Sequence, residues 1–269
     1  MIKVLVLFTC FNRCNASLNA IKKIKSNRKF KLQFIVVDGG SNDDTIYQIK
    51  KENNVEIIYG IGNLYYTEGM RIAIETAKSK YSDYDYVLLI NDDVDFYYDV
   101  IEKMIEQSIS QNNAVIVGAC EDGDGHLTYS AIKYTNGHKY VRLTIDDYEK
   151  DADSFNANCV LIPRDVFLSV DNMDSVYKHS LGDFDYGLSI RNNGFKIHCT
   201  NFFVGICRRN DITNTWQDVN LPISRRLKLK EEPKGMPFKE TFHYFRKNFG
   251  STYAVLASIK IYVKIIRKR

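Results

Sequence analysis

The chain has 269 residues and a mass of 31.1 kDa, enough for one large domain or for one domain with a small appendage. Hydrophobic residues make up 45% and charged residues 26%, which is typical of globular proteins and argues against a disordered chain. The net charge of +4 is unevenly distributed: residues 222–269 hold 13 Lys or Arg and 3 Asp or Glu, whereas residues 1–221 hold 24 and 30. The sequence therefore predicts an acidic body with a basic C-terminal extension.

The first half of the chain alternates short apolar runs with segments of helical periodicity. Strands are predicted at residues 2–8, 32–37, 55–59, 86–90 and 114–117. Helices are predicted at residues 16–24, about 43–53, 67–80 and 100–110. This alternation at short spacing indicates an α/β domain with a largely parallel sheet.

The pattern changes after residue 118. A hairpin is predicted across Asn136-Gly137, followed by a helix that ends at Gly194. The segments concerned are residues 127–134 and 139–144 for the hairpin, 183–193 for the helix, and 158–162, 196–200 and 202–207 for further strands. From Pro222 onward the chain is predicted to be helical. We therefore divide it into residues 1–118, 119–221 and 222–269.

The cysteines and the termini argue against several classes of protein. The six cysteines include no C-x-x-C pair, which argues against a zinc ribbon or a thioredoxin-like site. We expect free thiols in a reducing cytoplasm. The sequence enters a strand-like run at Ile2, so no signal peptide is expected. The most apolar C-terminal stretch, residues 253–266, is shorter than the ~20 residues of a membrane span and contains Lys260 and Lys264.

Acidic residues follow two of the predicted strands. Asp38 ends the second strand, and Asn91-Asp92-Asp93 follow the fourth. Ligands of open α/β sheets bind at the carboxyl ends of the strands, where such carboxylates can hold Mg²⁺ or Mn²⁺ against a phosphate. The alternative is that these residues only form turns or cap helices. The Gly60-Ile61-Gly62 loop lacks a full G-x-G-x-x-G and follows the third strand, which argues against a dinucleotide site.

Taken in order, these segments resemble the inverting glycosyltransferases of family 2, which have the GT-A fold. The resemblance includes Thr-Cys-Phe-Asn-Arg at residues 9–13, Val-Val-Asp-Gly-Gly-Ser at 36–41 and Asn-Asp-Asp at 91–93. Further matching segments are residues 62–71, 156–164, 179–188 and 193–195, so that the likeness covers roughly residues 1–210. It implies a Rossmann-like, mostly parallel sheet flanked by helices. Residues 1–118 would form the nucleotide-sugar half and residues 119–221 the acceptor half of a catalytic domain.

The resemblance implies roles for residues near the nucleotide. Asp38 would hydrogen-bond the base, and Thr9, Phe11 and Arg13 would flank it. Arg71 falls in a segment that lies near the nucleotide in the family.

The family's metal motif is often D-x-D, and this chain has Asn91-Asp92-Asp93 in its place. The resemblance therefore makes Asp93 the ligand of Mn²⁺ or Mg²⁺ and places Asp92 beside the nucleotide. Asn91 stands where the motif has its first Asp, so an amide replaces one carboxylate at this position.

The catalytic base of the family belongs to a Glu-Asp pair at the start of a helix. Counting back from Gly194 places Asp183 on the Asp of that pair and Gly182 on the Glu. Asp183 is accordingly the predicted base, with capping of the helix as the alternative role. Asp185 matches an acidic residue two positions later and is a candidate for contact with the acceptor or the donor sugar.

Two further residues are candidates for contact with the acceptor or the donor sugar. His179 lies four residues before Asp183, and Trp216 is the single tryptophan. Each has packing as its alternative role.

The C-terminal extension contains a basic amphipathic helix. Its apolar stripe at helical spacing consists of Leu256, Ile259, Val263 and Ile266. Its basic residues are Lys260, Lys264 and Arg267. Such a helix suits an anionic membrane surface, and the alternatives are packing on the body or on a second subunit in a homodimer. Nucleic acid is not an expected partner, since no recognition motif accompanies the charge.

The sequence thus predicts a metal-dependent, inverting hexosyl- or deoxyhexosyltransferase. Its donor would be a UDP- or dTDP-linked sugar, and its acceptor a hydroxyl of a glycan or lipid-linked glycan in bacterial surface polysaccharide synthesis. We expect a cytoplasmic enzyme, peripheral at the inner face of the plasma membrane. The alternatives are a catalytically inactive nucleotide-sugar-binding protein and a sugar nucleotidyltransferase, although residues 9–15 lack the Gly-rich phosphate loop of the latter.

Overall fold

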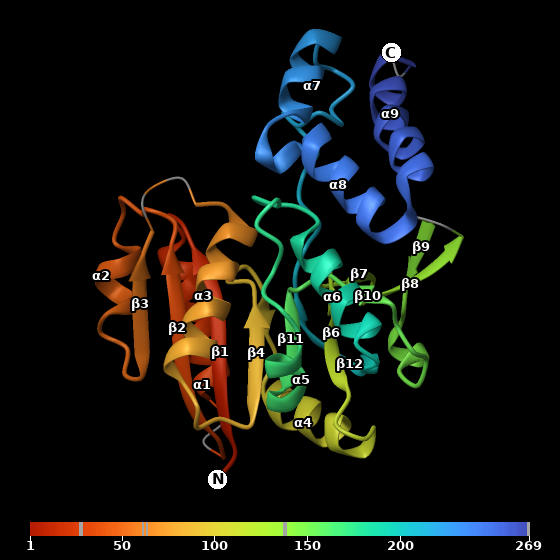
Figure 1. Ribbon diagram of the computed structural model, residues 1–269. Coiled ribbons are helices and arrows are strands. Elements are labelled where there is room, and N and C mark those ends of the chain that lie inside the picture. Colours follow the sequence, from red (N-terminus) through yellow and green to blue (C-terminus); the bar gives the residue numbers. More distant parts are fainter. Residues whose placement is uncertain (27–28, 61, 63, 137–138, 268–269) are drawn as a thin grey trace.

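A curved mixed sheet with helices on both faces forms the body of the protein, and a group of C-terminal helices stands over the ends of its strands (Figure 1). The computed structural model describes residues 1–26, 29–60, 62, 64–136 and 139–267. The strands of the main sheet lie in the order β3-β2-β1-β4-β11-β6-β12-β5, with β7 paired to β6. They are β1 (Lys3–Cys10), β2 (Lys31–Asp38), β3 (Val55–Tyr59), β4 (Tyr86–Ile90), β5 (Asp95–Phe96), β6 (Val115–Glu121), β7 (Leu127–Tyr129), β11 (Cys159–Pro163) and β12 (Ile197–Ile206).

The first four strands are parallel, as the sequence predicted. In register, Cys10 of β1 aligns with Asp38 of β2, and Asp38 aligns with Tyr59 of β3. The carboxyl ends of these strands therefore meet at one edge of the sheet. Strand β11 enters antiparallel between β4 and β6, and β12 returns parallel to β6, which makes the complete sheet mixed. This is the α/β, GT-A-like class expected from the sequence.

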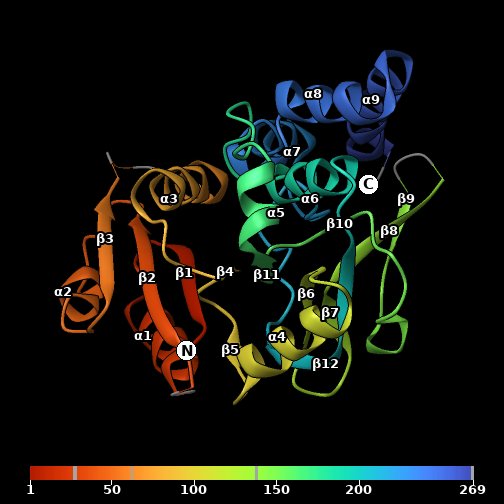
Figure 2. The same cartoon turned by 60° about the horizontal axis from the view of Figure 1, so that its bottom comes forward.

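Two apolar layers attach the helices to the sheet, because alternate residues of each buried strand point to opposite faces. Leu5 and Leu7 face a cluster that includes α3, α5 and α6, whereas Val6 and Phe8 face one that includes α1, α2 and α4. Figure 2 shows α3 and α6 on one side of the sheet and α1 and α4 on the other. The helices are α1 (Cys14–Lys25), α2 (Thr45–Ile49), α3 (Tyr66–Lys80), α4 (Val100–Ser110), α5 (Arg164–Ser169) and α6 (Gly182–Asn192).

A small antiparallel sheet flanks the body. Its order is β10 (Ser154–Phe155), β8 (Ala131–Asn136) and β9 (Lys139–Arg142), and a short 3-10 helix follows at Ile145–Asp147. The strand pair β8–β9 confirms the pairing of the predicted hairpin, although its first predicted strand is divided into β7 and β8. Gly137 of the predicted turn lies outside the described residues. The two strands predicted after Gly194 are one strand, β12, whose register shifts between Cys199 and Phe203.

The basic extension is helical, as predicted, and it packs against the body. It contains α7 (Ile223–Lys230), a 3-10 turn at Pro233–Gly235, α8 (Phe238–Phe249) and α9 (Ser251–Arg267). The guanidinium of Arg226 is buried between segments and donates hydrogen bonds to the carbonyl oxygens of Trp216 (3.0 Å) and Ile265 (3.1 Å). Within the described residues, no helix combines the length and apolarity that crossing a bilayer requires. All six cysteines are free thiols, as expected.

Candidate active site

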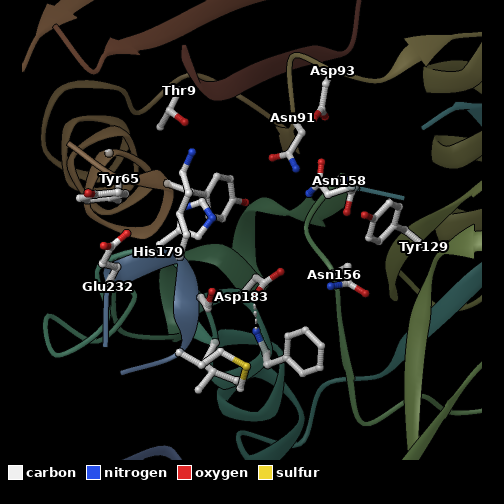
Figure 3. A pocket seen from close by; sticks show the side chains of 18 of the residues that line it. Thr9, Tyr65, Asn91, Asp93, Tyr129, Asn156, Asn158, His179, Asp183 and Glu232 are labelled. Carbon is white, nitrogen blue, oxygen red and sulfur yellow. Dashed lines mark hydrogen bonds between the residues drawn. The ribbon is translucent and has the colours of Figure 1, made fainter. Parts of the chain in front are cut away.

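A cavity of about 1050 Å³ opens at the carboxyl ends of the central strands, between the sheet and the C-terminal helices. Its walls come from the ends of β1, β2, β4 and β12, from the first turns of α3 and α6, and from α9. Figure 3 shows part of this lining, with Thr9 and Asp93 on one side and Asp183 on the other. Sites for small molecules commonly measure ~300–1,000 Å³. The cavity is therefore large enough for two substrates, and its position is the one expected for ligands of an open α/β sheet.

The two carboxylates after β4 have different environments. The Asp92 side chain is 4% exposed and accepts hydrogen bonds from Ser17 Oγ (2.7 Å) and Arg13 Nη1 (3.0 Å). Burial raises the pKa of Asp92 despite these partners. The Asp93 side chain is 37% exposed, and its Oδ2 lies 3.1 Å from the same Arg13 Nη1. Asp92 is thus fixed in the protein, whereas Asp93 presents its carboxylate to the cavity.

The groups around Asp93 fit a divalent cation that is shared with a substrate. Within the described residues, no group of three or more His, Cys, Asp or Glu side chains could hold a metal ion. Mg²⁺ usually binds one or two protein carboxylates and completes its shell with phosphate oxygens and water, and oxygen donors also suit Mn²⁺. Asp93 supplies one such carboxylate, and the amide of Asn91 lies beside it in Figure 3. Asp93 and Asn91 could therefore hold a divalent cation only together with oxygen ligands from outside the protein.

Asp183 lies in the first turn of α6, at the opposite side of the view in Figure 3 from Asp93. Its Oδ2 accepts a hydrogen bond from the backbone N–H of Ala157 (3.2 Å), and its Oδ1 accepts one from that of Phe184 (2.9 Å). Burial raises the pKa of Asp183 to about 6, although these hydrogen bonds favour the charged form. A fixed carboxylate with a pKa close to neutral is well suited to act as a general base.

Gly182 occupies the position where the resemblance expects a glutamate, and the reason is steric. A Cβ atom at Gly182 would lie 2.2 Å from Thr67 Cγ2 and 2.5 Å from Thr67 Oγ1. Thr67 cannot easily withdraw, because it is fully buried and its hydroxyl donates a hydrogen bond to the carbonyl oxygen of His179 (2.8 Å). The close packing of α3 on the start of α6 therefore excludes a side chain here, and Asp183 is the only carboxylate of the pair.

His179 lines the cavity as a neutral imidazole. Burial, with a smaller effect of the Lys234 and Arg13 charges, lowers its pKa to about 4. Its ring meets the ring of Tyr65 edge to face, with 6.0 Å between centroids, and Figure 3 shows the two side by side. Its Nδ1 is buried and has no hydrogen-bond partner among the described residues. His179 is therefore uncharged at neutral pH, and a neutral imidazole can donate one hydrogen bond to a sugar hydroxyl or accept one from it.

Most of the predicted site residues come together in this cavity. Those that line it are Thr9, Phe11, Arg13, Asp92, Asp93, His179, Asp183 and Trp216. Trp216 is 9% exposed at the cavity wall, and its carbonyl oxygen accepts a hydrogen bond from Arg226; its contact with a sugar stays a prediction. Asp38 is buried between two lining residues, and its Oδ1 accepts the backbone N–H of Ser41 (2.9 Å). Its contact with a base stays a prediction.

Two further predicted site residues do not line the cavity. The Asp185 side chain is 2% exposed and is bound by Lys247 Nζ (2.6 Å) and Asn248 Nδ2 (2.9 Å), so it joins α6 to α8. Arg71 lies outside the cavity wall, and its carbonyl oxygen accepts a hydrogen bond from Asn172 Nδ2 (2.8 Å). Their contacts with a ligand stay predictions.

Several lining residues were not predicted from the sequence. The phenol of Tyr66 is held neutral, because burial and the charges of Asp183 and Asp93 raise its pKa. Its hydroxyl donates a hydrogen bond to the carbonyl oxygen of Ala157 (3.4 Å). Further polar lining residues that had no predicted role in the site include Asn156, Asn158, Lys234, Lys260 and Lys264. They come from segments far apart in the sequence, so only the fold brings them together.

Comparisons with known proteins identify a family and a fold. The family model described as Glycosyl transferase family 2 matches residues 5–167, which include Thr9 and Asp93 but end before Asp183. A comparison with curated proteins found no match. Among solved structures, the crystal structure of S. aureus TarS 1-349 is similar, with a TM-score of 0.58 and 10% sequence identity over 99% of this chain and 81% of that chain. At this identity the likeness shows the fold alone.

Proposed function

The chain belongs to glycosyl transferase family 2, and from this we propose that it transfers a sugar from a nucleoside diphosphate to a hydroxyl group, with a divalent metal and with inversion. UDP- or dTDP-sugars are the proposed donors. The proposed acceptor is a glycan or lipid-linked glycan of a bacterial surface polysaccharide. One observation carries the proposal: a single cavity is lined by the exposed carboxylate of Asp93 and by Asp183, a carboxylate of raised pKa.

At the Asp93 side, the protein would hold the donor by its charged groups. Mn²⁺ or Mg²⁺, when bound, supplies Lewis-acid stabilisation to the departing diphosphate. The guanidinium of Arg13 lies between Asp92 and Asp93 and is 47% exposed, so it can also meet a phosphate oxygen. Although burial disfavours its charged form, the two carboxylates raise its pKa and keep it cationic.

At the opposite side, Asp183 would remove the proton of the acceptor hydroxyl. The backbone N–H groups of Ala157 and Phe184 fix the carboxylate, so little reorganisation is needed during the reaction. The neutral imidazole of His179 can orient a sugar hydroxyl by hydrogen bonding. Direct attack assisted by one base is a single displacement, and such a displacement inverts the anomeric carbon.

The proposal is tested by a transfer assay. Purified protein is incubated with UDP- and dTDP-sugars and a panel of glycan acceptors, in Mn²⁺, in Mg²⁺ and in excess EDTA. We expect release of nucleoside diphosphate that depends on acceptor and metal and stops in EDTA. Binding of the donor, followed by the fluorescence of the single Trp216, without turnover on any acceptor would favour the inactive binding protein. Formation of nucleoside diphosphate sugar and pyrophosphate from a nucleoside triphosphate and a sugar phosphate would favour the nucleotidyltransferase.

A further inference from the structure

Helix α9 presents three different faces along its length. Because successive residues are 100° apart, each face gathers residues three or four positions apart. The face packed on the protein is made of small or buried residues: Ala254, Ala257, Ser258 and Ile265. The apolar face of α9 is exposed to solvent and consists of Val255, Leu256, Ile259, Val263 and Ile266. The basic edge of α9 lies between the other two faces and consists of Lys260, Lys264 and Arg267.

The apolar face of α9 has no cover within the described part of the chain. Its residues are between 36% exposed at Val263 and 65% exposed at Leu256. Packing of this stripe on the body, one alternative left by the sequence, is therefore wrong. Contiguous apolar surface of this kind marks an interaction site more often than isolated exposed side chains do.

The basic edge of α9 borders the active-site cavity. Lys260 and Lys264 line it, together with Ile261 and with Ala257 of the packed face. The helix contains no Asp or Glu, and none of the ion pairs formed by the described residues involves these two lysines. The charge is thus available to an anion at the cavity mouth.

We propose that α9 lies on the surface of an anionic phospholipid bilayer, with its apolar face among the upper acyl chains and its basic edge among the headgroups. This partner rests on the proposed function, because it would deliver lipid-linked acceptors to the cavity mouth that Lys260 and Lys264 border. A helix with one apolar face, a basic flank and no acid suits this position in the interface. This position at the bilayer surface also explains why the apolar residues of α9 are exposed, although the helix is too short and too polar to span a membrane.

The charge of α9 favours a bilayer over a second copy of the chain as the occupant. A twofold dimer through the apolar face would place the same surface of both chains together. Where the two helices run antiparallel, the twofold axis places both basic edges on the same side of the interface, with no acidic residue on either helix to offset the repulsion. Anionic headgroups instead neutralise Lys260, Lys264 and Arg267 and gain affinity from each of them.

Vesicle co-sedimentation tests the proposal with the full chain. We expect binding to phosphatidylcholine vesicles that contain phosphatidylglycerol, with weaker binding to phosphatidylcholine alone and in high salt. Replacing both lysines, K260Q with K264Q, is expected to weaken binding to the anionic vesicles about 30-fold. Replacing Leu256→Ser with Ile259→Ser is expected to weaken it at least tenfold, since the apolar insertion is lost.

The matched control is Ile109→Ser, which removes a 57% exposed apolar residue from α4, far from α9 in Figure 1. It is expected to bind vesicles like wild type, and thermal unfolding confirms that all variants fold. Equal binding of wild type and the Leu256→Ser/Ile259→Ser variant would overturn the proposal. So would a lipid-free dimer, seen by sedimentation, that the same variant dissociates.

Transfer to a water-soluble acceptor, measured in parallel, separates this proposal from the proposed function. Neither Leu256 nor Ile259 lines the cavity, so the apolar-face variant is expected to keep the wild-type rate. Transfer without vesicle binding would refute only the membrane contact. Vesicle binding without transfer to any acceptor would refute only the proposed enzymatic activity.

Discussion

Replacing Asp183 with asparagine is expected to lower turnover by about 10²–10⁴-fold, the contribution typical of general-base catalysis. Asparagine is nearly isosteric, so it preserves the packing at the start of α6, but it cannot take up the proton of the acceptor. The affinity for the nucleotide sugar, followed by Trp216 fluorescence, is expected to remain close to that of the wild type. Equal turnover of the two proteins would show that Asp183 is not the base.

The pH dependence supplies a second test of the same residue. The pKa of Asp183 is about 6, and a base must be deprotonated, so kcat/KM is expected to fall as the pH drops below 6 and to level off above it. The Asp183→Asn variant should lose this inflection in its residual activity. An inflection that persists in the variant would assign the titration to another group.

The effect of Asp183 on thermal unfolding at different pH values distinguishes a buried base from a residue that only caps a helix. A carboxyl whose pKa is raised by folding binds its proton more tightly in the folded state, so its contribution favours folding at low pH and declines as the pH rises from about 4 to 6. At pH 8 the charged, buried Asp183 therefore opposes folding. We expect Asp183→Asn to unfold at a higher temperature than wild type at pH 8. A cap stabilised by the helix dipole would give the opposite result.

Replacing Asp93 with asparagine is expected to remove most of the metal-dependent activity. Lewis-acid stabilisation is worth several kcal/mol, and a loss of about 3 kcal/mol corresponds to roughly 10²-fold in rate. The variant should need a much higher Mn²⁺ concentration for half-maximal rate. Its unfolding temperature should change little, because the Asp93 side chain is 37% exposed and Asp92 retains Arg13.

Asp95 provides the control for this substitution. It lies two residues farther along the chain, is more exposed, and does not line the cavity. Asp95→Asn is expected to leave both the rate and the response to Mn²⁺ unchanged. A metal response of Asp93→Asn that matches wild type would place the cation elsewhere.

Much of the fold is predictable where local signals agree. Val55–Tyr59, Tyr86–Ile90 and Val100–Ser110 begin and end at the predicted residues, because apolar periodicity and flanking polar residues coincide there. The single strand β12 was predicted as two, since the polar, exposed Asn201 interrupts its apolar run. The structure keeps the strand continuous and accommodates the interruption by a shift in register.

The site was predictable only where residues fall on an ordered motif. Asp93 and Asp183 line the predicted cavity, but Asp185 was assigned to a ligand because its partner, Lys247, is 62 residues away in the chain. The sequence likewise does not show why residue 182 must be a glycine, because the steric clash that excludes a side chain there is with Thr67 of a distant segment. The spacing of residues within one segment cannot predict a contact with a segment that is distant in the sequence.

The C-terminal helix shows the same limit at the surface. Helical periodicity located the apolar stripe of α9. It did not predict whether that stripe faces the protein or the solvent, since either face of an isolated helix can be buried. The packed face instead contains Ala254, Ala257 and Ser258, whose small side chains allow α9 to approach its neighbours closely. The stripe was therefore left facing outward.

The anomeric configuration of the transferred sugar is the measurement that bears most directly on a single displacement with Asp183 as base. It can be read by NMR from the product of wild-type transfer, using a nucleotide sugar of known configuration. We expect an α-linked donor to give only β-linked product. Retention of the donor configuration would contradict a single displacement and would require a different role for Asp183.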